Sequence, residues 1–518
     1  MTRHALRLAA VLAFTAAPLA AQQTWTVDTT GAGALIDQGM NHSQVMDALR
    51  VLSDSIGPRL AGSPASRSAM EWAQRRFAGY GLATHAEAYS FGTPWERGTA
   101  TAWITSPFRR QMPMWSWAWT AGTNNRPSEG PVVRVDVSTP ESLAVNKAKV
   151  RGAWVMTADP ANLWNPDGPP MTAADSAAMQ AERQARFAAM RAANANVDSA
   201  TRAQRAQFRV DLPFLLRQAG ALGRLTDGAK DFDLATMSGS PAPCQAPSPL
   251  PNAVIGHDDY NMLFRQLNAG MRPRFSATID NRLGRDSMPQ WNVVAEIKGT
   301  EKPGEVVIVG GHFDSWDLAQ GTTDNGTGSM AAMEAIRIIQ ASGLKPKRTI
   351  RAVLFGSEEE GLLGSIAYAR AHAAESDSIQ AVLILDNGAG AITGQAMQGR
   401  PEFIPLWNDL FGPVSAMGPF NVHDGNKGGT DHLSFTPMGV PAFNYNQLTR
   451  GYNHTHHSQV DDYDHVPAAD MRQASTVMAV TAYELANLPG NILPRGPHAD
   501  SPNYCATLKP TAGLERVR

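Results

Sequence analysis

Apolar residues in the second half of the chain gather in short runs separated by helical patterns. Three of these runs are rich in β-branched residues and lie at 306–309, 350–355 and 381–385. Short runs of this kind, alternating with helices, are typical of parallel strands that are buried on both faces of a sheet. The alternation continues from about residue 291 to residue 488. The pattern therefore predicts an α/β fold for this part of the chain.

The pattern is different between residues 128 and 283. Short strand-like runs there are separated by an Ala-, Arg- and Gln-rich stretch at 173–207 and by a Pro-rich stretch at 241–251. The first stretch predicts a long exposed helix or helical hairpin, and the second predicts a loop. We therefore expect an insertion with its own small core. The expected division is a first part of the main domain at 22–127, the insertion at 128–283, a second part at 284–490 and a C-terminal coil at 491–518.

Residues 1–21 have the pattern of a secretory signal peptide. Basic residues within the first seven positions precede an apolar run at 8–17, and small residues follow at Ala20 and Ala21. The apolar run is too short to span a bilayer well, and no later stretch is long and apolar enough to do so. We therefore expect cleavage near Ala21 and a periplasmic or secreted protein with no stable membrane insertion. A retained N-terminal anchor is the alternative.

Composition narrows the classes of partner. The 518 residues carry a formal net charge of -2, which gives no reason to expect nucleic acid or an anionic membrane surface as a partner. The two cysteines, Cys244 and Cys505, are too few for a disulfide scaffold or a thiolate metal site. They could pair with each other, and the sequence alone leaves this open.

Side chains that can bind metals lie at the ends of the predicted strands. His312 and Asp314 follow the first run, Asp386 follows the third, and Asp324 lies just before a predicted helix. Each has a simpler interpretation. His312 could be a hydrogen-bonded structural residue, Asp324 a helix N-cap, and Asp386 part of an Asn-Gly turn.

Two further clusters complete the set. Glu358, Glu359 and Glu360 follow the second run. Acidic residues favour a helix N-terminus, but three adjacent acids at the end of a buried strand would repel one another unless a cation lay nearby. His456 and His457 lie in a polar stretch, for which a solvated loop is the simpler interpretation.

Taken together, these residues predict one metal site at the carboxyl edge of the sheet. Ligands gather outside the carboxyl ends of the strands in open α/β sheets. Nitrogen and oxygen ligands without cysteine fit Zn²⁺ or another divalent ion in a catalytic role. Two imidazoles and three carboxylates are enough for two ions that share one carboxylate. Two-metal sites of this kind serve aminopeptidases, phosphatases and nucleases.

The motifs at these positions resemble those of the M28 family of zinc metallopeptidases. They are His-x-Asp at 312–314, Glu-Glu-x-Gly-Leu-x-Gly-Ser at 358–365 and His-Ser-x-x-Asp at 457–461. The resemblance covers about 43–125 and 285–488. Within the family, the arrangement is similar to the plasma glutamate carboxypeptidase (carboxypeptidase Q-like) branch, with a protease-associated (PA) domain as the insertion. The resemblance implies a three-layer α/β/α mixed sheet of the zinc exopeptidase type, with an inserted small PA-like β-rich domain.

The resemblance also implies a role for each site residue, with two Zn²⁺ per chain. Matched by motif, Asp324 would bridge the two ions, and Glu358 would be the general base and acid. The remaining metal ligands would be His312, Glu359, Asp386 and His457. Asp314 would orient His312, as metal-bound histidines usually require.

Two positions depart from the family pattern. His456 stands before the last metal histidine, where the family often has an aromatic residue or Tyr that can hydrogen-bond the tetrahedral intermediate. His456 would take that role, with Tyr452 as its rival. Asp462 replaces a frequent Thr, which could change a hydrogen bond behind a metal ligand.

The implied activity is that of an exported exopeptidase of aminopeptidase or dipeptidase type, acting on peptides or dipeptides, with a homodimer left open. A transferrin-receptor-like binding module is one alternative, but such a module should have lost metal ligands. A glutaminyl cyclase-like acyltransferase would use one zinc and would not need the bridging Asp324. A two-metal phosphoesterase would need a basic cluster near the motifs, which the sequence lacks. The complete ligand set favours the peptidase.

Overall fold

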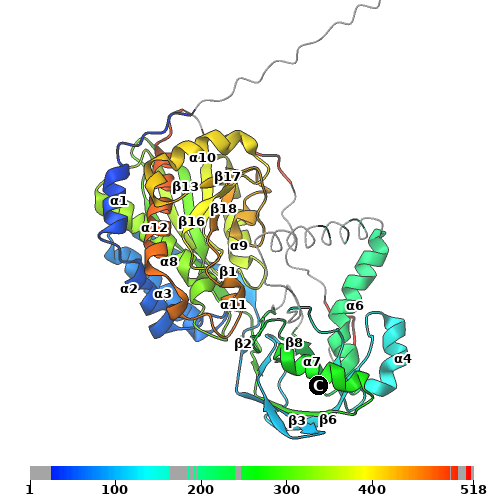
Figure 1. The fold of residues 1–518 in the computed structure, drawn as a ribbon. Coiled ribbons are helices and arrows are strands. Elements are labelled where there is room, and N and C mark those ends of the chain that lie inside the picture. Colours follow the sequence, from blue (N-terminus) through cyan, green and yellow to red (C-terminus); the bar gives the residue numbers. More distant parts are fainter. Residues whose placement is uncertain are drawn as a thin grey trace, which may run out of the picture.

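The computed structural model describes residues 25–163, 197–239, 247–490, 492–499 and 509–514, together with positions 185, 189 and 192. The predicted signal peptide and both cysteines lie outside the described residues, as does most of the stretch at 173–207, whose last residues lie in α6 (Ser199–Gln218). The chain forms a larger lobe and a smaller lobe (Figure 1). No helix within the described residues is long and apolar enough to cross a membrane.

The larger lobe is built on an eight-stranded mixed sheet. In spatial order its strands are β1 (Ala83–Gly92), β12 (Met288–Ile297), β14 (Arg348–Phe355), β13 (Lys302–His312), β15 (Ile379–Ile384), β18 (Ala442–Gln447), β16 (Ile392–Ala396) and β17 (Asn421–His423). The central strands β14, β13, β15 and β18 are parallel to their neighbours in that group. Every residue of β14 and β15 is buried. The predicted parallel strands, buried on both faces, are confirmed.

Helices cover both faces of this sheet, and the expected three layers are present (Figure 1). One face packs against α1 (Ala32–Met40), α2 (Val45–Arg50), α3 (Pro64–Gly79), α8 (Thr327–Ser342), α10 (Ile404–Leu410) and α12 (Ala468–Asn487). The other face packs against α9 (Leu363–Ala371). Successive side chains of β13 pack on opposite faces of the sheet. Val307 and Val309 lie in the core on the first face, and Val306 and Ile308 lie in the core on the second. This alternation follows from the two-residue period of a strand.

Short helical turns join these elements. They are η1 (Val51–Ile56), η2 (Thr322–Gly326), η3 (Ala373–Ser378), η4 (Pro401–Phe403), η5 (Gly412–Met417), η6 (Asp431–Ser434) and η7 (Tyr463–His465), with the four-residue helix α11 (Tyr452–Thr455). Two of them shape the candidate site: η2 contains Asp324, and α11 contains Tyr452 and ends just before His456.

The smaller lobe has a second mixed sheet of eight strands. In spatial order they are β4 (Arg110–Met112), β3 (Ala100–Ser106), β10 (Arg274–Ile279), β6 (Ser128–Arg134), β7 (Trp154–Met156), β8 (Gly223–Asp227), β9 (Asn252–Ile255) and β5 (Met114–Ser116). Its helices are α4 (Pro140–Val150), α6 (Ser199–Gln218) and α7 (His257–Asn268), and a small ribbon pairs β2 (Trp95–Glu96) with β11 (Arg282–Leu283). Because β3 already belongs to this sheet, we propose that the insertion begins nearer Ala100 than residue 128. Its PA-like character stays a prediction.

The smaller lobe is inserted between two neighbouring strands of the main sheet. Strands β1 and β12 are antiparallel, and Gly92 at the end of β1 lies opposite Met288 at the start of β12. An apolar core joins the two lobes, with Leu60 and Trp316 from the larger lobe and Trp119 and Met237 from the smaller.

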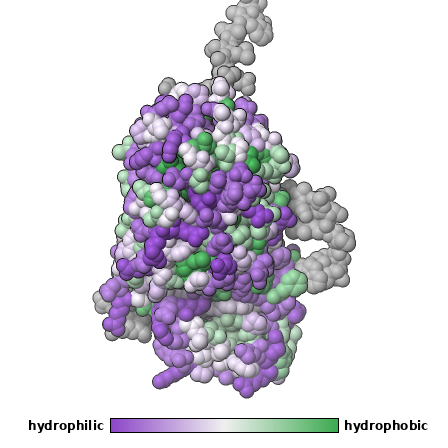
Figure 2. Space-filling model, turned by 90° about the vertical axis from the view of Figure 1, so that its left-hand side faces the viewer, coloured by the Kyte–Doolittle hydropathy of each residue, from purple (hydrophilic) through white to green (hydrophobic). Residues whose placement is uncertain are grey.

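The surface seen in Figure 2 is mainly hydrophilic, with hydrophobic residues scattered in small groups. Scattered apolar residues are normal on a folded protein, whereas a broad patch would indicate a partner or a membrane. This face therefore gives no sign of a large apolar docking area.

The buried carboxyl group of Glu484 on α12 should make the protein less stable as the pH rises. Its side chain is 1% exposed, both carboxyl oxygens lack a hydrogen-bond partner among the described residues, and burial, with the charge of Asp28, raises its pKa to about 9. Because the pKa is raised on folding, the group's contribution to stability is complete below about pH 4.5 and is lost as the pH rises toward 9, by at most ~1.4 kcal/mol per pH unit.

We therefore expect Glu484→Gln to unfold at higher urea concentration than the parent at pH 8, and at a similar concentration at pH 5. Urea unfolding at the two pH values measures the difference. Glu301→Gln, at a side chain that is 60% exposed, is the matched control and should change little at either pH. An equal effect of Glu484→Gln at both pH values would contradict the prediction.

Candidate metal centre

The carboxyl ends of the parallel strands bring the predicted site residues together. His312 is the last residue of β13 and pairs with Phe355 at the end of β14, three residues before Glu358. Asp386 follows β15 in the same register, since Gly310 of β13 pairs with Ile384. The loop after β18 brings His457 to the same edge. This is the edge at which open α/β sheets bind ligands.

Asp324 lies between two histidines. Its Oδ1 is 3.3 Å from His312 Nε2, and its Oδ2 is 3.4 Å from His457 Nε2. Each histidine also has a second carboxylate: Asp386 Oδ1 is 3.6 Å from His312 Nε2, and Glu359 Oε2 is 2.9 Å from His457 Nε2. The five side chains thus form two groups of candidate nitrogen and oxygen ligands that share Asp324.

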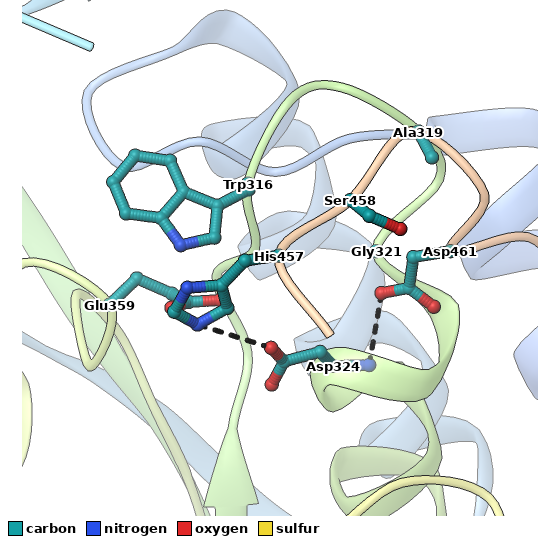
Figure 3. A pocket seen from close by; sticks show the side chains of 8 residues that line it. All are labelled: Trp316, Ala319, Gly321, Asp324, Glu359, His457, Ser458 and Asp461. Atoms are coloured by element: carbon teal, nitrogen blue, oxygen red, sulfur yellow. Dashed lines mark hydrogen bonds and ion pairs between the residues drawn. The ribbon is translucent and has the colours of Figure 1, made fainter. Parts of the chain in front are cut away.

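The chemistry of these groups fits zinc. Asp324 Oδ2 and Glu359 Oε1 are buried oxygen atoms without a hydrogen-bond partner among the described residues. Leaving such atoms unpartnered is costly, and a cation would stabilise them. Figure 3 shows Asp324, Glu359 and His457 around a small cavity that Trp316 and Asp461 also line. Its volume of about 10 Å³ suits an ion or a water molecule and is too small for a peptide.

Burial and mutual repulsion dominate the electrostatics of the acids. Burial raises the pKa of Glu358 well above its ordinary value, although His312 opposes this, and Asp386 and Glu359 raise it further. Burial likewise raises the pKa of Glu359, with Asp324 adding to the effect. Burial acts against ionisation of Asp324 too, but the bond to His312 and the neighbouring histidines lower its pKa overall. A carboxylate at the centre is therefore surrounded by acids that a cation would help to ionise.

Asp314 supports the site through two sets of bonds. His312 Nδ1 lies 3.2 Å from the main-chain oxygen of Asp314, which accepts a hydrogen bond from it. The Asp314 carboxylate accepts hydrogen bonds from the main-chain N–H groups of Glu358 and Glu359, both at 3.1 Å. Asp314 thus holds both the ring of His312 and the turn that carries the two glutamates.

Asp461 holds the main chain at Asp324. Its carboxylate accepts hydrogen bonds from Thr323 N at 2.6 Å and Asp324 N at 3.1 Å, as the dashed line to Asp324 in Figure 3 shows. Burial and the charge of Asp324 raise the pKa of Asp461 to about 7. The motif at 457–461 contains Asp461, but the sequence did not predict this role. Its neighbour Asp462 accepts a long 3.4 Å bond from Gln320 N, outside the ligand groups.

Arg59 is a supporting residue that sequence reasoning missed. It is fully buried, and its guanidinium donates to the main-chain oxygens of Gly57, Phe313, Gln320 and Gly321. Three of these carbonyls belong to the segment between His312 and Asp324. Burial lowers its pKa to about 10, so the group stays charged at neutral pH beside Asp461, Asp314 and Asp324. Arg59 lies in a Gly-Pro-Arg loop that is distant in sequence from all of the metal-binding motifs, and nothing in that loop's residues indicates a contact with the segment between His312 and Asp324.

His456 and Tyr452 both lie beside the shared carboxylate. His456 Nε2 is 3.9 Å from Asp324 Oδ2, and its side chain is 43% exposed. The rings of His456 and His457 are stacked at 3.8 Å, and Tyr452 contacts His456 edge-on at 5.0 Å. Tyr452 also interacts with Asp324, and burial raises the pKa of its hydroxyl well above normal. The geometry brings both rivals to the site.

Comparisons with known proteins identify a matching family, a curated relative and solved structures of similar fold. The model of "Peptidase family M28" matches residues 292–482. Carboxypeptidase Q of Bos taurus is 28% identical over 464 residues, which cover 88% of each chain. The crystal structure of a peptidase M28 precursor from Shewanella amazonensis has a TM-score of 0.71 and 24% identity, and the match covers 90% of this chain and 99% of that one. A zinc aminopeptidase from Bacillus subtilis has a TM-score of 0.56 and 18% identity over 91% of this chain and 100% of its own. Both solved structures share the fold of this chain.

Proposed function

The chain belongs to peptidase family M28 and is a zinc metallopeptidase, and on this premise we propose that it is an exported exopeptidase with two zinc ions. Two ions are supported by the position of the Asp324 carboxylate: one of its oxygens faces His312, and the other faces His457. His312 and Asp386 would hold one ion, and His457 and Glu359 the other, with Asp324 common to both. When bound, zinc acidifies a water molecule and polarises the peptide carbonyl.

Glu358 is the proposed general base and acid. Its Oε2 lies 4.0 Å from His312 Nε2, at the border of the ligand groups, and its side chain is 11% exposed. The carboxylate takes a proton from the attacking water and then gives it to the leaving amine. Glu358 follows a buried strand, and Asp314 holds its main-chain N–H, so the backbone that carries the carboxylate is fixed.

His456 and Tyr452 are the proposed donors to the oxygen that becomes negative during the reaction. Hydrogen-bond donors placed where charge develops stabilise the transition state. Burial lowers the pKa of His456 to about 4, so its neutral ring has one N–H to donate. Tyr452 keeps its hydroxyl proton because of the raised pKa described above. The sequence placed His456 first, and the geometry supports both.

Peptides or dipeptides are the proposed substrates. The binding-module and acyltransferase alternatives are not favoured, because the five proposed ligands and Glu358 lie close together. Export rests on the signal-like pattern at residues 1–21. A homodimer stays a proposal without a supporting contact in the structure.

The test is zinc content measured together with hydrolysis. We expect about two zinc ions per chain, with chelator-sensitive release of terminal residues from an aminoacyl reporter or from members of a dipeptide panel. The reason is that Asp324 lies between His312 and His457, each of which has a further carboxylate beside it. Elemental analysis after dialysis gives the metal content, and product release with and without chelator gives the activity. A chain with no zinc, or full activity after metal removal, would contradict the proposal.

A further inference from the structure

A loop of the smaller lobe contacts the metal-binding segment of the larger lobe. Met237 N donates to the main-chain oxygen of His457 at 2.8 Å, and Met237 O lies 3.0 Å from His457 Nδ1. A carbonyl oxygen can only accept, so Nδ1 carries the ring proton. The Nε2 lone pair of His457 is then free on the side of Asp324 and Glu359. The smaller lobe thereby sets the tautomer that a metal ligand needs.

Further bonds attach the same loop on both sides of His457. Gln459 Oε1 accepts from Ala235 N at 2.9 Å, and Gln459 Nε2 donates to Asp233 O at 3.1 Å. Lys230 Nζ donates to Asn453 O at 2.6 Å. The loop at 228–238 therefore binds the segment before and after the histidine and not at one point only.

Packing around His457 adds to the bonds. Met237 is buried in the apolar core between the lobes, together with Trp316, whose ring contacts the His457 ring edge-on at 5.9 Å. The backbone of His457 has φ 58°, in the left-handed region that residues other than glycine adopt only when their surroundings hold them there. The two main-chain bonds with Met237 supply such surroundings.

The two histidines differ in where their support comes from. His312 is oriented by the main-chain oxygen of Asp314, two residues along its own chain segment. His457 is oriented by Met237, from the other lobe. We propose that the smaller lobe contributes to the metal centre. Its 228–238 loop determines how tightly a zinc ion binds to His457, Glu359 and Asp324. This inference rests on the proposed two-ion site.

Gln459→Ala tests the inference because it breaks the attachment of the loop without touching a ligand. Substitution of a residue that supports a metal ligand typically lowers metal affinity 10–100-fold. We expect one of the two zinc dissociation constants to rise about 10-fold or more and the other to stay within about 2-fold. Competition with a chromophoric chelator measures both constants. In the Co²⁺-loaded protein, the visible absorption of one ion should change and that of the other should not.

Gln473→Ala is the matched control. Gln473 holds a backbone segment in the same way, accepting from Ile392 N at 2.8 Å and donating to Ile392 O at 2.9 Å, away from the loop and the ligands. It should lower the melting temperature without changing either zinc constant. If Gln459→Ala does not fold, Lys230→Met breaks the same attachment from the other side, and Lys230→Arg should restore the parent affinity.

Two results would overturn the inference, and they are distinguishable. Two zinc ions with unchanged constants in folded Gln459→Ala, or in Lys230→Met, would show that the loop does not act on the metal site. A single zinc in the parent protein would contradict the two-ion proposal itself and this inference with it.

Discussion

Glu358→Gln should lose nearly all peptide hydrolysis while still binding zinc. The amide cannot take a proton from water or give one to the leaving amine, and general acid–base catalysis typically contributes 10²- to 10⁴-fold. We therefore expect kcat to fall by about that factor, with zinc content unchanged, because the five proposed ligands remain. Steady-state kinetics on a dipeptide, with elemental analysis of the same sample, measures both quantities.

Glu360→Gln is the matched control for this substitution. Glu360 is a neighbouring glutamate, it is 2% exposed, and burial raises its pKa well above normal. The same change from carboxyl to amide there removes neither the proposed base nor a proposed ligand. Its activity should stay within a few-fold of the parent. Hydrolysis by Glu358→Gln at the parent rate would remove Glu358 from the mechanism.

Arg59→Met should be strongly destabilising. The substitution leaves four main-chain oxygens without their donor and removes a buried positive charge beside Asp461, Asp314 and Asp324. Removing one partner from a buried charged network costs about 3–5 kcal/mol. We expect a loss of that size in the free energy of unfolding, measured by urea denaturation at pH 7.

The matched control is Arg274→Met. Arg274 makes an exposed ion pair with Glu129, its side chain is 46% exposed, and exposed pairs contribute about 0–1 kcal/mol. A loss below about 1 kcal/mol for Arg59→Met as well would mean that the segment between His312 and Asp324 holds its shape without the guanidinium.

The fold was predictable where burial alone decides the pattern. The runs at 306–309, 350–355 and 381–385 can be identified because parallel strands are apolar on both faces. The extent of the smaller lobe was less predictable. Strand β3 looks the same in sequence whether it pairs with the main sheet or with β10, and pairing between distant segments leaves no local signal.

The gathering of the candidate metal ligands at one sheet edge was predictable for a different reason. His312, Asp324 and Asp386 stand at strand or helix ends, where the topology of the sheet fixes a common edge. Their support could not be predicted in the same way. Met237 contributes only main-chain atoms, so its side chain gives no indication of the role, and Arg59 binds only carbonyl oxygens, which every residue has.

The pairing of β1 with β12 makes the whole smaller lobe the tip of one long hairpin. Entry and exit lie side by side, with Gly92 opposite Met288, so a short turn could close the same hairpin and leave the register of the main sheet intact. The entropy of closing a loop changes only slowly with its length, so such a shortened chain would lose little on that account. It would also lack the carbonyl of Met237 that faces His457. If the proposed two-ion site is correct, a chain shortened in this way should keep its architecture and bind the ion at His457 more weakly.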